Sequence, residues 1–146
     1  MDETFQDMIA GAIAGAPYGK TLGFELTGLE EDRALLSLPY REDLTTIGTM
    51  VHGGAIASLV DAAATAACWA TSHLPENPRG STIGFSINYL DAALSADLTA
   101  DARVIRRGGS VHVATVVVSD TAGKQIAQAT VTYKLSGKPS GKKARG

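Results

Sequence analysis

The residues with the clearest chemical potential lie in one stretch, where the glycine pair Gly53-Gly54 opens a long run of small and apolar residues, mostly alanine. This composition favours a helix. A helix that begins with glycines has free backbone N–H groups with no side chain over them, and such groups attract a negatively charged oxygen. The oxyanion that develops at a carbonyl under attack is one such charge. A glycine pair also permits a tight turn or close packing, so a purely structural interpretation stays open.

Asp61 is the only carboxylate of this run, which extends from His52 to Thr71 and is apolar nearly all round. Such a helix is expected to be buried. A buried carboxylate is costly unless it is paired or hydrogen-bonded, and the nearest arginines, Arg41 and Arg79, lie outside the run. Asp61 is therefore either held by hydroxyl or backbone donors, or it acts as a general base or nucleophile in an apolar cleft.

The glycine pair and Asp61 lie far apart along the predicted helix. Eight residues correspond to a rise of about 12 Å, so Gly53 and Asp61 of one helix do not reach the same carbonyl. Two copies packed antiparallel about a twofold axis would bring each Asp61 near the partner's Gly53, and twofold dimers are the commonest oligomers. A joint role of the two residues therefore predicts a homodimer with two shared sites, which a monomer in solution would contradict.

The elements around this helix have the patterns of a short helix and of antiparallel strands. Helical spacing predicts a short amphipathic N-terminal helix over residues 4–14, closed by Pro17 and Gly19. Alternation predicts strands over residues 22–30, 33–38, 81–90, 98–106, 111–119 and 124–136. The fold class is α+β, with a long central helix wrapped by an antiparallel sheet of about six strands.

The strand expected over residues 81–90 follows a proline-rich loop, residues 74–78, and shows the clearest alternation. One face of this strand carries Ile83, Phe85, Ile87 and Tyr89. Thr82 falls on the opposite face, with Gly84, Ser86 and Asn88.

Composition sets further bounds. The 146 residues suit a single domain, residues 1–136, followed by a basic tail, residues 137–146, that is expected to be disordered. The net charge of −2 implies neither a nucleic-acid nor a membrane partner. A single cysteine, Cys68, and three histidines without metal-ligand spacing predict neither disulfides nor a metal site. The acidic N-terminus does not suit a signal peptide, and no apolar run is long enough to span a bilayer, so a cytoplasmic protein is expected.

Together these features resemble the hotdog-fold acyl-CoA thioesterases, and most closely their PaaI-like subgroup of the phenylacetic acid degradation type. The resemblance covers residues 18–136. It rests on His52-Gly53-Gly54, on the acid nine residues after the histidine and on the order of the elements. The segments from Gly84 to Leu90 and from Arg106 to Gly108 add to it.

The resemblance implies hydrolysis of an acyl-CoA thioester without a metal or other cofactor. The Gly53 N–H would polarise the thioester carbonyl, and Asp61 of the partner subunit would activate water or attack the carbonyl. Thr82, on the strand after the helix, would help to position the water. The acyl group would be small or medium in size, aromatic groups included, and the protein would be a homodimer or a dimer of dimers.

Further residues are implied in substrate binding. Arg106 and Arg107 would meet the phosphates of coenzyme A, although solvated turn charges are an equally good interpretation. His52 and Gly54 would shape the substrate site. Many relatives carry an Asn or Gln a few residues before the histidine, whereas residues 44–51 contain no amide side chain, so the hydroxyl of Thr46, or of its neighbour Thr45, would have to serve as the second donor.

Two other functions stay open on the sequence. A hotdog domain can bind acyl-CoA without catalysis, and the missing amide gives this alternative some support. The same scaffold also hosts dehydratases and hydratases of acyl thioesters. Those relatives generally use a catalytic histidine paired with an acid in a different sequence context, which is not found here.

Overall fold

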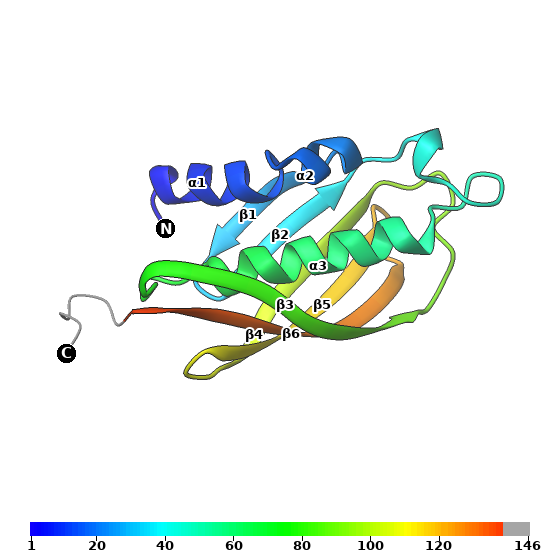
Figure 1. Ribbon diagram of the computed structural model, residues 1–146. Coiled ribbons are helices and arrows are strands. Elements are labelled where there is room, and N and C mark those ends of the chain that lie inside the picture. The colour runs from blue at the N-terminus through cyan, green and yellow to red at the C-terminus, as the bar shows by residue number, and fades with distance from the viewer. Residues whose placement is uncertain (139–146) are drawn as a thin grey trace.

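A computed structural model describes residues 1–138 of the chain and shows a six-stranded antiparallel sheet that curls around one long helix (Figure 1). The strand order in the sheet is β1-β2-β4-β5-β6-β3. The elements are α1 (Glu3–Ile13), α2 (Pro17–Leu22), β1 (Glu25–Glu30), β2 (Arg33–Leu38), the short 3-10 helix η1 (Glu42–Leu44), α3 (Gly53–Trp69), β3 (Glu76–Tyr89), β4 (Leu98–Arg107), β5 (Val111–Asp120) and β6 (Gln125–Lys138). The expected architecture, a long helix wrapped by six strands with a short N-terminal helix, is confirmed.

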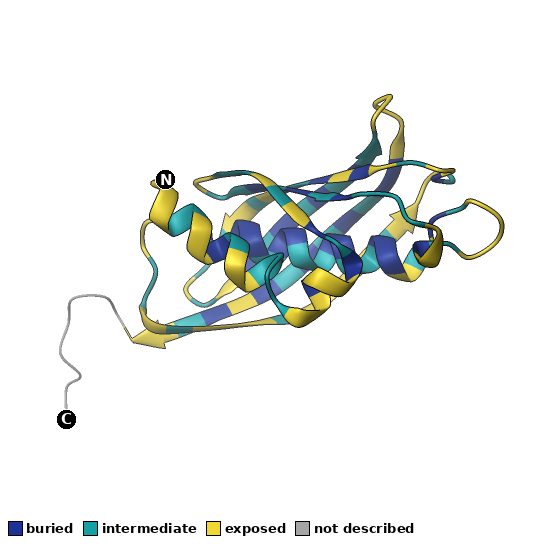
Figure 2. Cartoon of the chain, turned by 90° about the horizontal axis from the view of Figure 1, so that it is seen from above, coloured by how far each residue is buried: buried dark blue, intermediate teal, exposed yellow. Residues whose placement is uncertain are grey.

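Helix α3 is buried on most of its circumference because its small side chains allow the sheet to approach closely (Figure 2). Its alanines contribute much of the core, with leucines and valines of the sheet packed against them. One stripe of the helix is only partly covered. It consists of Gly54, Ala57, Ser58, Asp61, Ala62 and Thr65. The helix is therefore not fully buried at its carboxylate.

The N-terminal segment differs from the expectation. Pro17 does not close the first helix; it begins a second one, α2, because proline suits the first helical position, where no N–H is needed. Helix α2 ends at Gly23, which adopts the left-handed conformation with φ +83°. The first strand consequently begins at Glu25 and not at residue 22.

Strand β3 is longer than expected and begins at Glu76, inside the proline-rich segment predicted to be a loop. It lies at the edge of the sheet, where a proline such as Pro78 costs no ladder hydrogen bond. The long partner strand β6 accordingly reaches Lys138, which pairs with Glu76. Residues 137 and 138 of the predicted tail are thus part of the sheet, and the rest of that tail lies outside the described residues.

A β-bulge at Ile83 makes the faces of β3 differ from those predicted by alternation. Thr82 is paired with Tyr133 of β6, but the next pair joins Gly84 to Thr132, so one residue of β3 is unmatched. The bulge changes the alternation, and Thr82 comes to lie on the same inner face as Phe85, Ile87 and Tyr89. The prediction that Thr82 faces away from these residues was therefore wrong, since strict alternation assumes an unbroken ladder.

Gly80 allows β3 to cross a partly buried polar pair, in which the indole N–H of Trp69 donates to the hydroxyl of Tyr133 at 2.8 Å. A Cβ atom on Gly80 would overlap that hydroxyl and lie 2.7 Å from the indole nitrogen. We expect Gly80→Ala to lower the free energy of unfolding by about 1–3 kcal/mol, the usual cost of overpacking. Urea denaturation measures this change, with Gly84→Ala as the matched control on the same strand, because nothing lies within 4 Å of its Cβ position. Equal midpoints for the two variants would contradict the prediction.

No helix in the described part of the chain is both long and apolar enough to cross a membrane.

Candidate active site

The first turn of α3 leaves one backbone donor free. His52 caps the helix: its Nδ1 accepts the N–H of Gly54 at 2.7 Å, and its C=O accepts the N–H groups of Ala55 and Ile56. Within residues 1–138 the N–H of Gly53 has no acceptor. The structure thus gives the two glycines different roles, because only Gly53 offers a free donor of the kind that stabilises an oxyanion. The predicted role of Gly54 in shaping the substrate site stays a prediction.

Asp61 and Thr82 meet beside this helix, as their predicted joint role requires. The hydroxyl of Thr82 donates to Oδ1 of Asp61 at 2.6 Å, a short distance typical of a bond to a charged acceptor. Asp61 comes from the partly covered stripe of α3, and the bulge in β3 turns Thr82 toward it. Among the described residues only Thr82 bonds this carboxylate, so Oδ2 is free to accept a proton or attack a carbon.

One chain holds the two halves of the candidate site apart. Gly53 and Asp61 lie on the same straight helix, eight residues and about 12 Å from one another. The Gly53 N–H stands at the helix start and the Asp61–Thr82 pair stands at its middle. A substrate carbonyl that touches both groups therefore requires a second copy of the chain.

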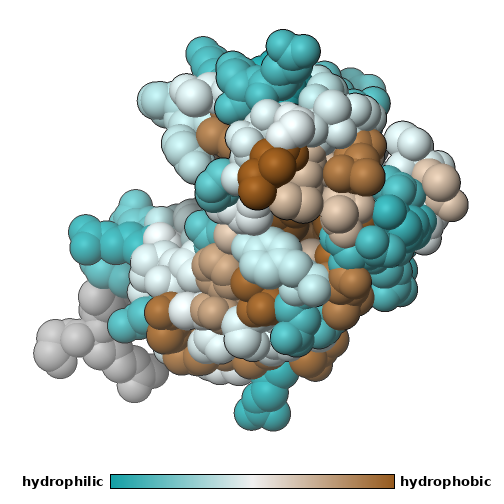
Figure 3. All heavy atoms as spheres, turned by 90° about the vertical axis from the view of Figure 1, so that its right-hand side faces the viewer, coloured by the Kyte–Doolittle hydropathy of each residue, from teal (hydrophilic) through white to brown (hydrophobic). Residues whose placement is uncertain are grey.

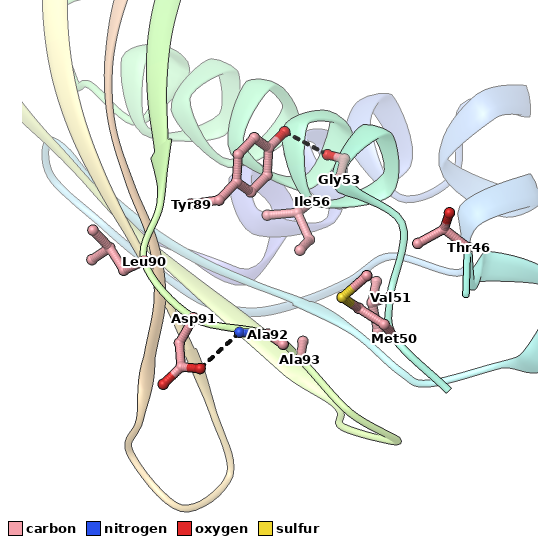
Figure 4. Close-up of a pocket in the computed structure, with 10 residues that line it drawn as sticks. All are labelled: Thr46, Met50, Val51, Gly53, Ile56, Tyr89, Leu90, Asp91, Ala92 and Ala93. Atoms are coloured by element: carbon pink, nitrogen blue, oxygen red, sulfur yellow. Dashed lines mark hydrogen bonds between the residues drawn. The ribbon is translucent and has the colours of Figure 1, made fainter. Parts of the chain in front are cut away.

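An apolar cavity of about 340 Å³ lies at the start of α3 and includes Gly53 in its wall. Figure 3 looks onto this end of the molecule, where hydrophobic side chains surround a hollow. The apolar part of the lining consists of Met50, Val51, Ile56, Leu90, Ala92 and Ala93 (Figure 4). Thr46, which is predicted to serve as the second donor, also belongs to the wall. A cavity of this volume and character suits a small apolar group.

The two arginines predicted to contact phosphate point to opposite faces of the sheet. Arg107 is paired with the buried His112 and so lies on the inner face, where its Nε donates to Oδ1 of Asp32 at 2.9 Å. Arg106 is paired with Val113, lies on the outer face and is exposed. The ion pair with Asp32 accounts for Arg107 structurally, whereas Arg106 is available to a ligand.

A second cavity, of about 390 Å³, lies at the C-terminal end of α3 and includes Arg107 and His112 in its wall. Burial lowers the pKa of His112, and the positive charge of Arg107 acts in the same direction. The imidazole is therefore neutral at pH 7, and Arg107 supplies the charge in this part of the wall.

Cys68 and Tyr133 are removed from acid–base chemistry by burial. Burial raises the pKa of the Cys68 thiol to about 11, so the thiol is protonated at neutral pH and is a poor nucleophile. Burial also raises the pKa of Tyr133, whose hydroxyl stays protonated and bonded to Trp69. Burial therefore makes both residues poor candidates for a nucleophile or a general base.

Tyr89 is the residue at this site that sequence reasoning missed. Its hydroxyl donates to the C=O of Gly53 at 2.7 Å, and its ring lies against the glycine and in the cavity wall (Figure 4). Alternation placed Tyr89 on the apolar face of its strand. Its contact with Gly53 could not be predicted, because the two residues are 36 positions apart in the chain and no local pattern signals such a contact.

The fold of this chain has counterparts among known proteins. Residues 48–127 match the family described as the Thioesterase superfamily. The medium/long-chain acyl-CoA thioesterase YigI of Escherichia coli is 31% identical over 134 residues, covering 82% of this chain and 85% of YigI. A thioesterase family protein from Silicibacter pomeroyi has a TM-score of 0.82 and 25% identity, covering 90% and 97% of the two chains.

A further solved structure carries a ligand. The protein smu.793 from Streptococcus mutans, bound to acetyl CoA, has a TM-score of 0.70 and 25% identity, covering 80% of this chain and 90% of its own. These similarities define a hotdog thioesterase fold. The chain belongs to the thioesterase superfamily.

Proposed function

We propose that this protein is an acyl-CoA thioesterase that hydrolyses the thioester of a small or medium apolar acyl group. The observation that carries this proposal is Gly53, which lines an apolar cavity and whose N–H has no acceptor among residues 1–138, while the neighbouring N–H groups of the same turn are bonded. A free donor beside an apolar cavity suits a thioester carbonyl with its acyl chain. YigI, an acyl-CoA thioesterase, and smu.793, which binds acetyl CoA, support the same substrate class.

In the proposed mechanism Asp61 of the partner subunit acts on a carbonyl held at Gly53. As a general base, its carboxylate takes a proton from water while the water oxygen bonds to the thioester carbon. The negative charge moves to the carbonyl oxygen, where the Gly53 N–H stabilises it. The C–S bond then breaks, and the thiolate of coenzyme A leaves and takes up the proton. Direct attack by Asp61, followed by hydrolysis of the anhydride, uses the same two groups.

The proposal includes a twofold dimer. Strand β3 is a free edge that exposes large apolar side chains, with Ile83 57% and Phe85 39% exposed. An exposed apolar edge is a site of association unless another chain covers it. Pairing two such edges would also bring the partly covered stripes of α3 together and set Asp61 of each chain toward the partner's Gly53. The association of two such dimers stays a prediction.

We assign the remaining substrate contacts from the positions of the candidate residues in the structure. We assign the acyl group to the cavity beside Gly53, with the Thr46 hydroxyl in its wall and His52 as the residue that shapes the helix start. The exposed Arg106 is assigned to the phosphates of coenzyme A, and Arg107 stays a prediction because Asp32 already binds it. The PaaI-like subgroup and a cytoplasmic location also stay predictions.

A spectrophotometric measurement of thiol release tests the function. Benzoyl-, phenylacetyl- and straight-chain acyl-CoAs are each incubated with the protein and a thiol reagent, which the buried Cys68 will not consume. Catalytic release of coenzyme A supports the proposal, and the profile across the panel identifies the acyl group. Acyl-CoA binding without release would favour the binding module instead. Conversion of an enoyl- or hydroxyacyl-CoA with the thioester intact would favour a hydratase or dehydratase.

A further inference from the structure

We propose that Tyr89 is a positioning residue of this thioester hydrolysis, because it fixes the peptide that follows the Gly53 N–H and so limits the backbone rotation of Gly53. The inference rests on the proposed function and adds a residue that the resemblance to thioesterases does not assign. Tyr89 is the last residue of β3, and Gly53 is the first residue of α3. The contact thus ties the edge strand to the helix start at the wall of the cavity (Figure 4).

Two contacts carry the proposal. The hydroxyl of Tyr89 donates to the C=O of Gly53 at 2.7 Å. The ring covers the same residue so closely that a Cβ atom on Gly53 would lie 3.3 Å from its Cζ and 3.5 Å from its Cε1. Gly53 is therefore held on one side by a hydrogen bond and by van der Waals contact with a single side chain.

The helix start needs such a tether because it consists of two glycines. Glycine has more backbone freedom than any other residue, so a Gly-Gly first turn frays unless other groups hold it. His52 holds the N–H of Gly54 through Nδ1, and its own N–H donates to the C=O of Leu44 at 2.8 Å. Tyr89 holds the C=O of Gly53. The Gly53–Gly54 peptide is thus anchored at its C=O by Tyr89 and at its N–H by His52. The preceding peptide, which carries the Gly53 N–H, is held at the C=O of His52 by the N–H groups of Ala55 and Ile56. With the peptides on both sides of Gly53 anchored, its N–H keeps one direction.

The hydroxyl of Tyr89 is not explained by packing alone. The side chain is 51% exposed, so a phenylalanine would fill the same place in the cavity wall. The bulge at Ile83 shifts the alternation of β3 by one residue. Because of this shift, Thr82 and Tyr89 both face α3. Thr82 serves Asp61 and Tyr89 serves Gly53, so one strand supports both halves of the catalytic machinery.

The test compares Tyr89→Phe with Tyr18→Phe in the thiol-release assay. Tyr18 is the matched control because its exposed hydroxyl also bonds α3, at Ser58, without touching Gly53. We expect Tyr89→Phe to lower kcat by about tenfold, less than the loss of the donor itself, with KM within about twofold of the wild type. Tyr18→Phe is expected to leave kcat unchanged. An unchanged kcat in Tyr89→Phe would overturn the proposal.

A second background separates positioning from general structural damage. In Gly53→Pro the donor N–H is absent, so the hydroxyl of Tyr89 has nothing left to position there. We expect Tyr89→Phe to change kcat by less than about twofold in that background, a non-additive result typical of coupled groups. The same tenfold loss in both backgrounds would show a structural role and overturn the proposal. A wild-type protein without any thiol release would instead refute the proposed function, and this inference with it.

Discussion

Replacing Asp61 with asparagine is expected to lower kcat by about 10³-fold or more while the fold persists. Asparagine has the size of aspartate, and its Oδ1 can still accept the hydroxyl of Thr82, which now lies at 2.6 Å. It neither takes a proton from water at neutral pH nor attacks a carbonyl. The variant therefore removes the proposed chemistry and keeps the contact between α3 and β3.

Steady-state thiol release measures this loss, and urea denaturation checks that the fold is intact. Asp7→Asn on α1 is the control, because that carboxylate is exposed and far along the chain from α3. Near-normal turnover in Asp61→Asn would remove the residue from the mechanism. A large loss in both variants would point to net charge, and not to a catalytic group.

Removing the Gly53 N–H is the second change with a large expected effect, and proline removes it with little damage to the helix. Gly53 is the first residue of α3, the position where proline is best tolerated. His52 already has the extended conformation that a residue before proline requires, with φ −62° and ψ 136°. We expect Gly53→Pro to lower kcat by about 10²–10³-fold, as the loss of one oxyanion donor does.

Gly53→Ala is the matched control for this variant. Alanine places a Cβ atom at the same 3.3 Å from the ring of Tyr89, but it keeps the N–H. We expect its kcat to fall by less than about tenfold, because the ring has to shift by only a few tenths of an ångström. If alanine is as damaging as proline, the contact with Tyr89 matters and the N–H does not.

A mixture of the two inactive variants tests whether the site is shared between subunits. In a mixed dimer of Asp61→Asn and Gly53→Pro chains, one site combines the intact Gly53 of one chain with the intact Asp61 of the other. Random exchange after partial unfolding should therefore restore about a quarter of the wild-type activity, since half of the dimers are mixed and each has one good site of two. A site contained in one chain would leave the mixture inactive.

Much of the site could be predicted from the sequence, because the signals lie within single elements. The long apolar run predicted α3, and the glycine pair predicted free N–H groups at its start. The spacing from Gly53 to Asp61 predicted that a joint role of the two residues needs two chains. Alternation also predicted six strands in the right order. These features depend on local periodicity and helix geometry, which neighbouring residues determine.

Only the tertiary structure decided how the elements meet. The bulge at Ile83 turned Thr82 toward Asp61, although alternation placed it on the other face. The same pairing with β6 placed Tyr89 over Gly53. The pairing of β4 with β5 placed Arg106 on the outer face of the sheet and Arg107 on the inner face. A bulge and a cross-strand register arise from the fit between segments distant in the chain, so no pattern within one strand determines them.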